Sequence, residues 1–269
     1  MRTLVAGAAG SIGSVVTAGL TTSGHEVVAL DLLPPPAANA LPWYTLDCAD
    51  PDAVAALFAE EQFDAVVHLA GIPHEADYPS SFSSHVSTTA ALLDAMVAHR
   101  VDRIVYASSN HAVGRTPRAE LPGGLLTVEA RPRPDTFYGA AKVAAEGLLS
   151  LYADRHRIDA VACRIGSFLD EPTSIRALST WLSPADAVRM VTAGLTAPAP
   201  GFAVIYGISA NSRGWWDLEP GRALGYHPQD DAESYADQVG AAPDDAADAA
   251  HVGGPYAGPD LVAPAFPTD

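Results

Sequence analysis

The chain has 269 residues, 48% of them hydrophobic, and a formal net charge of −17 at pH 7 from 15 basic and 32 acidic residues. This hydrophobic fraction is enough to bury the core of one large domain or two small ones, and no apolar run approaches the roughly 18 residues of a membrane span. Such a negative chain repels nucleic-acid backbones and anionic membrane surfaces, so we expect neither as a partner.

The compartment follows from the first residues and from the cysteines. The chain starts directly with an apolar strand pattern, without an apolar signal region or a small-residue cleavage site. Cys48 and Cys163 lie far apart in apolar surroundings, which favours a reducing compartment over a disulfide framework or a zinc site. We therefore expect a cytoplasmic protein without a metal.

Short apolar runs alternate with helical patterns through the first part of the chain. Valine-rich runs that are typical of parallel strands buried on both faces are "RTLVAGAAG", "HEVVALDL", "FDAVVHLAG" and "VDRIVYASS". Helical patterns cover residues 11–20, 52–60, 88–99 and 138–155, and "DAVACRIGSF" predicts a sixth strand. Asp50 and Pro51 mark the start of the second helix. This alternation predicts an α/β fold of the Rossmann type, a doubly wound parallel sheet with helices on both faces.

After Ser167 the alternation breaks. "LSPADAVRMVTAGL" predicts a helix capped by Ser183, "FAVIYGIS" a short strand and "QDDAESYADQV" a further helix. We divide the chain into a Rossmann core (residues 1–166), a small region woven onto it (167–239) and an irregular tail (240–269). The tail is rich in alanine, aspartate, proline and glycine, and we expect it to pack on the surface or to be partly ordered by a partner subunit.

The first strand ends in a glycine-rich loop, "AGAAGSIG", with Gly7, Gly10 and Gly13. Glycines here allow a tight turn and let a pyrophosphate approach the N-terminus of the next helix. Such a loop alone is weak evidence and could be a simple turn. Asp31, at the end of the second strand, stands where an acid binds the adenosine ribose hydroxyls, although it could also be a capping or turn residue. Its carboxylate would repel a 2′-phosphate, and no arginine occurs in residues 32–41, so the pattern predicts NAD.

Lys142 is the one lysine of the chain and follows Tyr138 by four residues, on the same face of a helix. Lowering the pKa of a phenol from about 10 to about 7 requires about 4 kcal/mol. A cation about 4 Å away contributes about that much at an effective dielectric constant of about 20. A compact ammonium that also reaches two ribose hydroxyls suits this task better than a broad guanidinium. The pair therefore indicates a tyrosine base assisted by a lysine.

Four polar residues end the fifth strand, Ser108, Ser109, Asn110 and His111. They fall at the carboxyl edge of the sheet, where ligands of such folds bind. Strand alternation allows one of the two serines to face the cleft. The alternative is a polar turn without a function.

Together these residues resemble the extended short-chain dehydrogenase/reductase superfamily: the glycine loop, Asp31, "HLAG" (residues 68–71), the serine pair and Tyr138-x-x-x-Lys142. In that pattern the reactive serine stands five residues before a glycine, which implies that Ser109 is catalytic together with Tyr138 and Lys142. The adenine ring would contact Asp47 and Cys48. The implied cofactor-binding residues are Gly7, Gly10, Ser11, Ile12, Gly13, Asp31, Asp47, Cys48, Leu69, Ala70, Gly71, Tyr138 and Lys142.

Longer stretches over nearly the whole chain resemble the uronate dehydrogenases: "ASSNH", "RIGSF", "SIRALSTWLSPAD", "YGISANSRGWWDLEPGRALGYHPQDDAESY" and "HVGGPYAG". The resemblance implies NAD-dependent oxidation of a hexuronic acid, glucuronate or galacturonate, at C1 to the aldarolactone, with release of NADH. The implied substrate-binding residues are Ser109, Asn110, His111, Tyr138, Ser167 and Arg176. The family also implies a homo-oligomer that pairs through the helix of Tyr138 and the helix before the fifth strand.

Arg176 would hold the substrate carboxylate. A guanidinium binds a carboxylate at two points and gives local positive charge to an acidic protein. The alternative is a surface ion pair with Asp170 or Glu171. For Trp215 and Trp216 we favour packing over sugar stacking.

Two residues depart from the family pattern. Pro73 replaces a serine that contacts the substrate, and it has neither a hydroxyl nor an amide hydrogen. His85 replaces an asparagine of the superfamily pattern, and is either part of a proton path or a satisfied core histidine. Two other functions stay open: a nucleotide-sugar epimerase or dehydratase on the same fold, and an NAD-binding sensor or scaffold without turnover.

Overall fold

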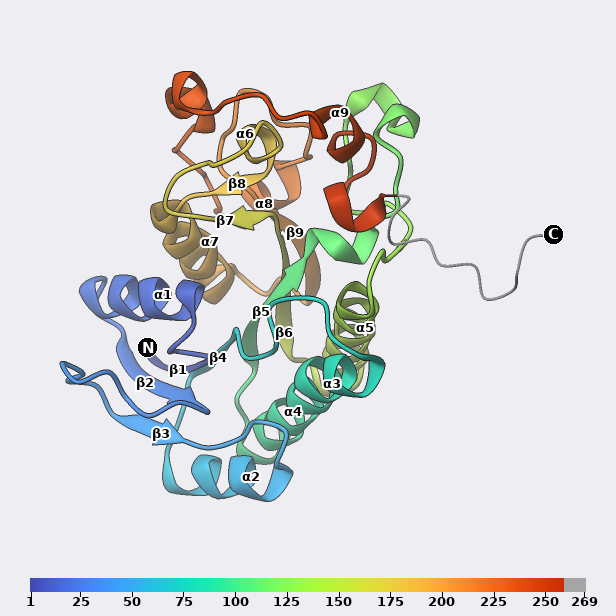
Figure 1. Cartoon of the computed structure of the whole chain (residues 1–269). Coiled ribbons are helices and arrows are strands. Elements are labelled where there is room, and N and C mark those ends of the chain that lie inside the picture. Colours follow the sequence, from blue (N-terminus) through green and yellow to red (C-terminus); the bar gives the residue numbers. More distant parts are fainter. Residues whose placement is uncertain (259–269) are drawn as a thin grey trace.

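The computed structural model describes residues 1–258, which form a seven-stranded sheet between two layers of helices (Figure 1). The strand order is β3-β2-β1-β4-β5-β6-β9, and all neighbouring strands are parallel. The strands are β1 (Arg2–Ala6), β2 (Glu26–Asp31), β3 (Trp43–Thr45), β4 (Ala65–His68), β5 (Arg103–Ser109), β6 (Asp159–Ile165) and β9 (Phe202–Gly207). This confirms the predicted Rossmann-type sheet.

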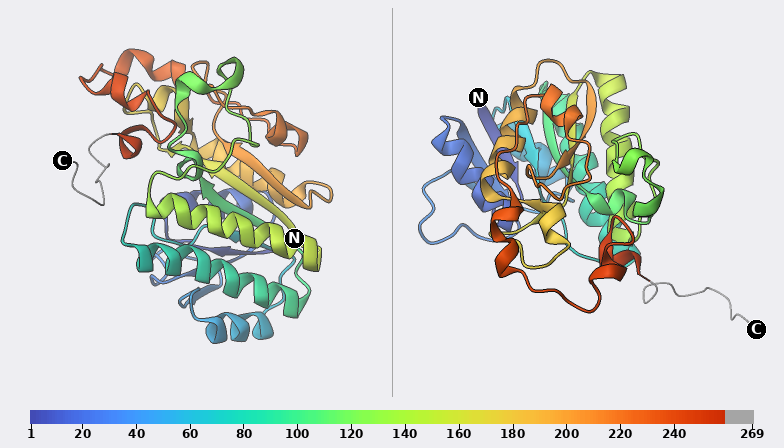
Figure 2. Two further views of the ribbon diagram at one scale, coloured as in Figure 1. Left: turned by 90° about the vertical axis from the view of Figure 1, so that its right-hand side faces the viewer. Right: turned by 90° about the horizontal axis from the view of Figure 1, so that it is seen from above.

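The two faces of the sheet carry different helices. Helices α2 (Pro51–Glu60), α4 (Thr88–His99) and α5 (Phe137–His156) cover one face, and α1 (Ser11–Thr22) and α7 (Pro184–Thr196) cover the other (Figures 1 and 2). Each layer has its own buried cluster, with Leu92 and Met96 in the first and Leu20, Met190 and Val191 in the second. Because both faces are buried, the central strands are continuous apolar runs.

The helix starts follow local capping chemistry. The Asp50 carboxylate accepts hydrogen bonds from the N–H groups of Asp52 and Ala53 at the start of α2, and Ser183 Oγ accepts one from Asp186 N–H at the start of α7. Both helices begin with a proline, as the sequence predicted, because a first-turn residue needs no amide hydrogen.

The sixth strand was predicted to extend further at its C-terminal end than the structure shows. It stops at Ile165, and Ser167–Phe168 form β7, which pairs with β8 (Trp181–Leu182) in a separate two-stranded sheet. Gly166 lies between them, where an added Cβ would be 2.2 Å from the Thr180 carbonyl oxygen. The chain can therefore leave the main sheet here only through a glycine.

Two other expectations for the C-terminal part need correction. The segment "QDDAESYADQV" forms a 3₁₀ helix, η5 (Ala232–Gln238), and not an α-helix. Of its residues only Ala232 is buried, while Tyr235 and Ala236 are partly buried against the same cluster as Trp181. The tail is ordered in part: α9 (Asp245–Asp248) and η6 (Gly254–Ala257) flank the buried Val252. Residues 259–269 of that tail lie outside the described residues.

Of the segments after β6, β9 completes the sheet and α7 covers one of its faces, whereas β7, β8 and α6 (Ala177–Thr180) come after the carboxyl end of β6 (Figure 1). Helix α8 (Glu219–Ala223) lies beside β9, with Gly221 near Ile205. Trp215 and Trp216 stack with ring centroids 3.9 Å apart and are each 5% exposed, in a cluster with Val252, which agrees with a packing role. No helix within residues 1–258 is long and apolar enough to cross a membrane.

Candidate cofactor and substrate site

The glycine loop between β1 and α1 meets the loop after β4 at close range. Gly7 has φ +86°, and a Cβ there would lie 2.6 Å from Ala70 N. A Cβ at Gly13 would lie 2.0 Å from the Gly7 carbonyl oxygen, so the first turn of α1 also needs glycine. Gly10, which precedes α1, offers no side chain to its first amides. These amides and the helix dipole favour an anion at this point.

A cavity of about 440 Å³ opens above this loop. Of the predicted cofactor residues, those that line it are Gly7, Gly10, Ser11, Ile12, Gly13, Asp31, Asp47, Cys48, Leu69, Ala70 and Gly71. Tyr138 and Lys142 do not line it. The sequence did not indicate eleven further lining residues, which adjoin the predicted ones or lie on neighbouring elements: Ala9, Leu30, Leu32, Leu33, Leu46, Ile72, Pro73, His74, Ser84, Thr88 and Ala107.

Asp31 lines the cavity and also holds the loops around it. Its Oδ2 accepts a hydrogen bond from Ala9 N–H at 2.8 Å, and its Oδ1 accepts one from Leu33 N–H at 3.0 Å. The cofactor and turn interpretations of this carboxylate are therefore compatible.

Tyr138 and Ser109 are adjacent at the carboxyl end of β5. Burial raises the pKa of the Tyr138 phenol, and a hydrogen bond with Ser109 acts in the opposite direction. Ser108 instead donates to Glu146, away from Tyr138. Of the two serines, strand alternation thus directs Ser109 toward the tyrosine.

The Lys142 ammonium lies below the tyrosine ring. Its Nζ is 5.4 Å from the ring centroid of Tyr138 and 4.8 Å from that of Tyr106, and it donates to the Ala107 carbonyl oxygen at 2.6 Å. The side chain is buried, which lowers its pKa to about 7, while the Glu146 carboxylate opposes this shift. The spacing of four residues does place the ammonium near the tyrosine ring. Burial nevertheless raises the pKa of the phenol, which is opposite to the direction that a base near neutral pH requires, so stabilisation of a phenolate by Lys142 stays a prediction.

Arg176 and Asn110 converge on one backbone oxygen of the C-terminal segment. Arg176 Nη2 donates to the Val252 carbonyl oxygen at 2.8 Å, and Asn110 Nδ2 lies 3.4 Å from the same atom. Arg176 Nη1 is 3.4 Å from Ser167 Oγ, which joins a third predicted residue to the group. Within residues 1–258 Arg176 makes no ion pair, so the surface pair with Asp170 or Glu171 is absent from the described structure.

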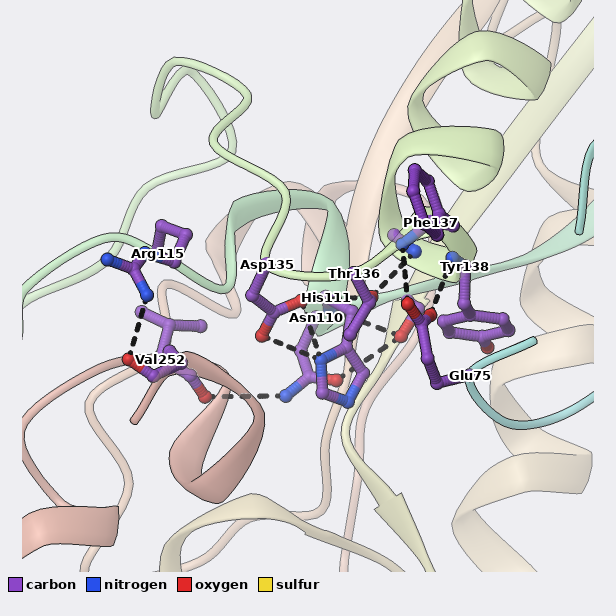
Figure 3. A network of polar contacts seen from close by, with 12 residues as sticks. Glu75, Asn110, His111, Arg115, Asp135, Thr136, Phe137, Tyr138 and Val252 are labelled. Carbon is purple, nitrogen blue, oxygen red and sulfur yellow. Dashed lines mark hydrogen bonds and ion pairs between the residues drawn. The ribbon is translucent and has the colours of Figure 1, made fainter. Parts of the chain in front are cut away.

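The ring of His111 lies near the ring of Tyr138 (Figure 3). Its Nδ1 lies 2.9 Å from Asp135 Oδ2, and its ring makes edge contacts with Tyr138 (5.9 Å) and Tyr256 (5.0 Å between centroids). Asp135, Val252 and Tyr256 were not among the predicted site residues. Val252 and Tyr256 lie within "HVGGPYAG", one of the stretches that resemble the uronate dehydrogenases, but only tertiary packing brings that stretch and Asp135 to the site.

Glu75 closes the N-terminus of α5 (Figure 3). Its two carboxylate oxygens each accept a hydrogen bond at 3.1 Å, from Phe137 N–H and Tyr138 N–H. A negative charge is favourable there because the first amides of a helix have no partner within it. This contact ties the loop after β4 to the residue that carries the phenol.

The parallel sheet, the glycine loop and the Ser109, Tyr138 and Lys142 group define a nicotinamide-dependent oxidoreductase of the short-chain dehydrogenase/reductase type. Residues 3–169 match the NAD dependent epimerase/dehydratase family, and the chain belongs to this family. Its cofactor is NAD. No cluster of metal-binding side chains is found in the described part of the chain.

Known relatives extend the resemblance to the whole chain. The uronate dehydrogenase of Pseudomonas putida is 37% identical over 251 residues, which cover 92% of this chain and 91% of that enzyme. The crystal structure of uronate dehydrogenase from Agrobacterium tumefaciens superimposes with a TM-score of 0.87 at 35% identity, covering 95% of this chain and 96% of that one. A tyrosine-to-alanine mutant of that enzyme, solved in complex with NAD, gives the same values. These relatives confirm the similarity to uronate dehydrogenases that the sequence indicated.

Proposed function

We propose that this protein oxidises a free hexuronic acid, glucuronate or galacturonate, at C1 to the aldarolactone and releases NADH. The observation that carries this proposal is Arg176. The residue is partly buried next to Asn110, and its guanidinium donates only to neutral oxygens, those of Val252 and Ser167. Burial lowers the pKa of Arg176, because the charged guanidinium is less well solvated there than in water. A bound carboxylate would offset this loss of solvation free energy. The names of the relatives support the same substrate class.

The residues present fit NAD. The glycine loop has no room for side chains at Gly7 and Gly13, and the cavity above it ends at Ala107, the residue whose carbonyl oxygen accepts from Lys142. When bound, NAD supplies the acceptor for the hydride that leaves C1.

The protein's own residues would handle the proton. The Tyr138 phenolate takes the proton of the anomeric hydroxyl, and the oxygen then forms the lactone carbonyl as the C1–H bond gives up its hydride. Ser109 donates a hydrogen bond to the same oxygen. Lys142 stabilises the phenolate by its charge, and residues 167–239 would contribute Ser167 and Arg176 to the substrate.

An epimerase or dehydratase function is less well supported. Such enzymes act on nucleotide sugars, whose diphosphate needs several free cations. After Ser167 the basic residues are Arg176, Arg189, Arg213 and Arg222. The last three pair with Asp186 and Asp230, with Glu233 and with Glu219, respectively. Among these four arginines, Arg176 alone makes no ion pair within residues 1–258, which suits a single carboxylate. A sensor without turnover would not need the Ser109, Tyr138 and Lys142 group.

The test is the absorbance at 340 nm of purified protein with NAD. The panel contains glucuronate, galacturonate, the parent neutral hexoses and UDP-glucuronate. We expect NADH to accumulate with the free uronates alone. If calorimetry shows that NAD binds while neither uronate gives a signal, the proposal is wrong, and turnover of UDP-glucuronate without net NADH would support the epimerase alternative.

We also propose that the protein is a cytoplasmic homo-oligomer. Support comes from its two buried free cysteines and from the exposed apolar side chains of Phe137 and Leu151 on α5. Light scattering coupled to gel filtration gives the mass in solution, and a mass of 27.9 kDa, that of one chain, would contradict the oligomer.

A further inference from the structure

The imidazole of His85 lies between the cofactor cavity and Tyr138. The residue is 1% exposed, and its ring meets the Tyr138 ring edge-on with centroids 5.1 Å apart. His85 Nε2 is 3.0 Å from the Ile72 carbonyl oxygen. A carbonyl oxygen can only accept, so Nε2 carries the proton and donates. Nδ1 is then an acceptor, and it has no partner among residues 1–258.

The same ring presses against the backbone of Gly71. This glycine has φ +145°, and a Cβ there would lie 2.3 Å from His85 Cε1 and 2.4 Å from Nδ1. Gly71 and Ile72 both line the cofactor cavity. One side chain therefore touches the cofactor wall and the phenol, which belong to different elements of the fold.

A π-helical turn, η1 (Ser83–Ser87), holds His85 in this place. It joins α3 (Tyr78–Phe82) to α4 and widens the helix by one residue per turn. The Thr88 and Thr89 hydroxyls donate to the carbonyl oxygens of Ser84 (2.7 Å) and His85 (2.6 Å), respectively. Backbone and side chain of His85 are thus both fixed.

The ring is neutral. Burial and the nearby Lys142 charge lower its pKa to about 2, so the ring does not take up a second proton near neutral pH. A charged imidazole here would also oppose the lysine that stabilises the phenolate. The chemistry available to His85 is therefore a single N–H donor and a rigid surface, not acid or base catalysis.

We infer that His85 is a positioning residue of the dehydrogenase reaction, which sets the distance between the Tyr138 phenol and the Gly71–Ile72 wall of the cofactor cavity. The inference rests on the proposed function. It also accounts for two departures from the family pattern together. Pro73, next to Ile72, brings neither a hydroxyl nor an amide hydrogen to this loop, and the His85 hydrogen bond anchors the loop at the preceding residue.

The test compares two variants. His85→Leu has a side chain of similar bulk but no hydrogen-bond donor, and His85→Gln keeps an N–H donor. The matched control is His227→Gln, at an exposed position. NAD affinity is measured first by calorimetry, because it does not depend on the substrate. We expect His85→Leu to weaken NAD binding about five- to tenfold and the two glutamine variants to stay within about threefold.

Turnover of the uronate is the second readout. We expect His85→Leu to lower kcat about 10- to 100-fold, with the KM of the uronate nearly unchanged, and the primary deuterium isotope effect at C1 to rise. His85→Gln should recover most of kcat. Equal losses in His85→Gln and His85→Leu, or wild-type NAD affinity and kcat in His85→Leu, would overturn the inference. If the wild-type protein oxidises no uronate, the proposed function fails, and the order of the NAD affinities still decides the role of His85.

Discussion

Glu146 and Arg164 form a buried ion pair at two points, one helical turn beyond Lys142. Arg164 Nε lies 3.0 Å from Oε1 of the carboxylate, and Nη2 lies 2.8 Å from Oε2. Both side chains are less than 10% exposed. The pair as a whole is neutral, but its carboxylate lies close enough to Lys142 to raise the pKa of that ammonium against the effect of burial.

This relationship predicts that Glu146→Gln lowers the pKa of Lys142 further below about 7. A pKa of about 7 leaves the wild-type ammonium partly protonated at pH 7, and the lowered pKa would leave it mostly neutral there, so kcat at pH 7 should fall by about tenfold or more. The pH–rate profile of the uronate reaction measures this effect.

Glu146→Gln alone leaves Arg164 buried without a partner, which costs stability by itself. The double variant Glu146→Gln/Arg164→Met separates the two effects. It should unfold at nearly the wild-type temperature and keep the lowered kcat. A wild-type pH profile in the double variant would show that the carboxylate has no influence on Lys142.

Tyr138→Phe removes the proposed base. We expect kcat to fall by about 10²-fold or more, with NAD affinity little changed, since the phenol does not line the cofactor cavity. Tyr152→Phe on the same helix removes a hydroxyl that bonds to Asp94, away from the site, and should keep kcat. Comparable rates for the two variants would remove Tyr138 from the mechanism.

Arg176→Met removes the proposed carboxylate contact. We expect kcat/KM for glucuronate and galacturonate to fall by about 10²-fold or more, because the carboxylate of the bound substrate would lose its charge partner. NAD affinity should not change, and Arg222→Met, which breaks a surface pair with Glu219, is the control. A loss that is equal for both variants, or that appears in NAD binding, would contradict a specific role in holding the substrate.

The buried His68 should make the free energy of unfolding depend on pH. Burial and the Lys142 charge lower its pKa to about 3 from an ordinary 6.5. Between these pH values the unfolded chain binds the proton and the folded chain does not, so this group lowers the free energy of unfolding as pH falls from about 6.5 to 3. The slope from one such group is at most about 1.4 kcal/mol per pH unit.

Urea titrations across that pH range measure this slope. His68→Gln should have a shallower dependence than the wild type, whereas His227→Gln, at an exposed position, should run parallel to it. A slope in His68→Gln equal to that of the wild type would mean that His68 is protonated in the folded protein.

The sequence alone determined the sheet and the position of Tyr138 and Lys142 on one face of a helix, because the signals for these are local. Strands buried on both faces require continuous apolar runs, a helix start requires a capping side chain such as Asp50, and a spacing of four residues puts Tyr138 and Lys142 on one face. The glycine loop carries its own constraint in Gly7 and Gly13, where no Cβ fits.

Only the tertiary structure decided the substrate side of the site. The contacts of Arg176 with Val252, of His111 with Asp135 and of Glu75 with the start of α5 join segments far apart along the chain. Packing of loops has no sequence period, and the same residues could have formed surface pairs or turns. The place of His85 has the same origin: a π-helical turn and a glycine with positive φ bring its ring against the phenol, and neither is encoded by spacing.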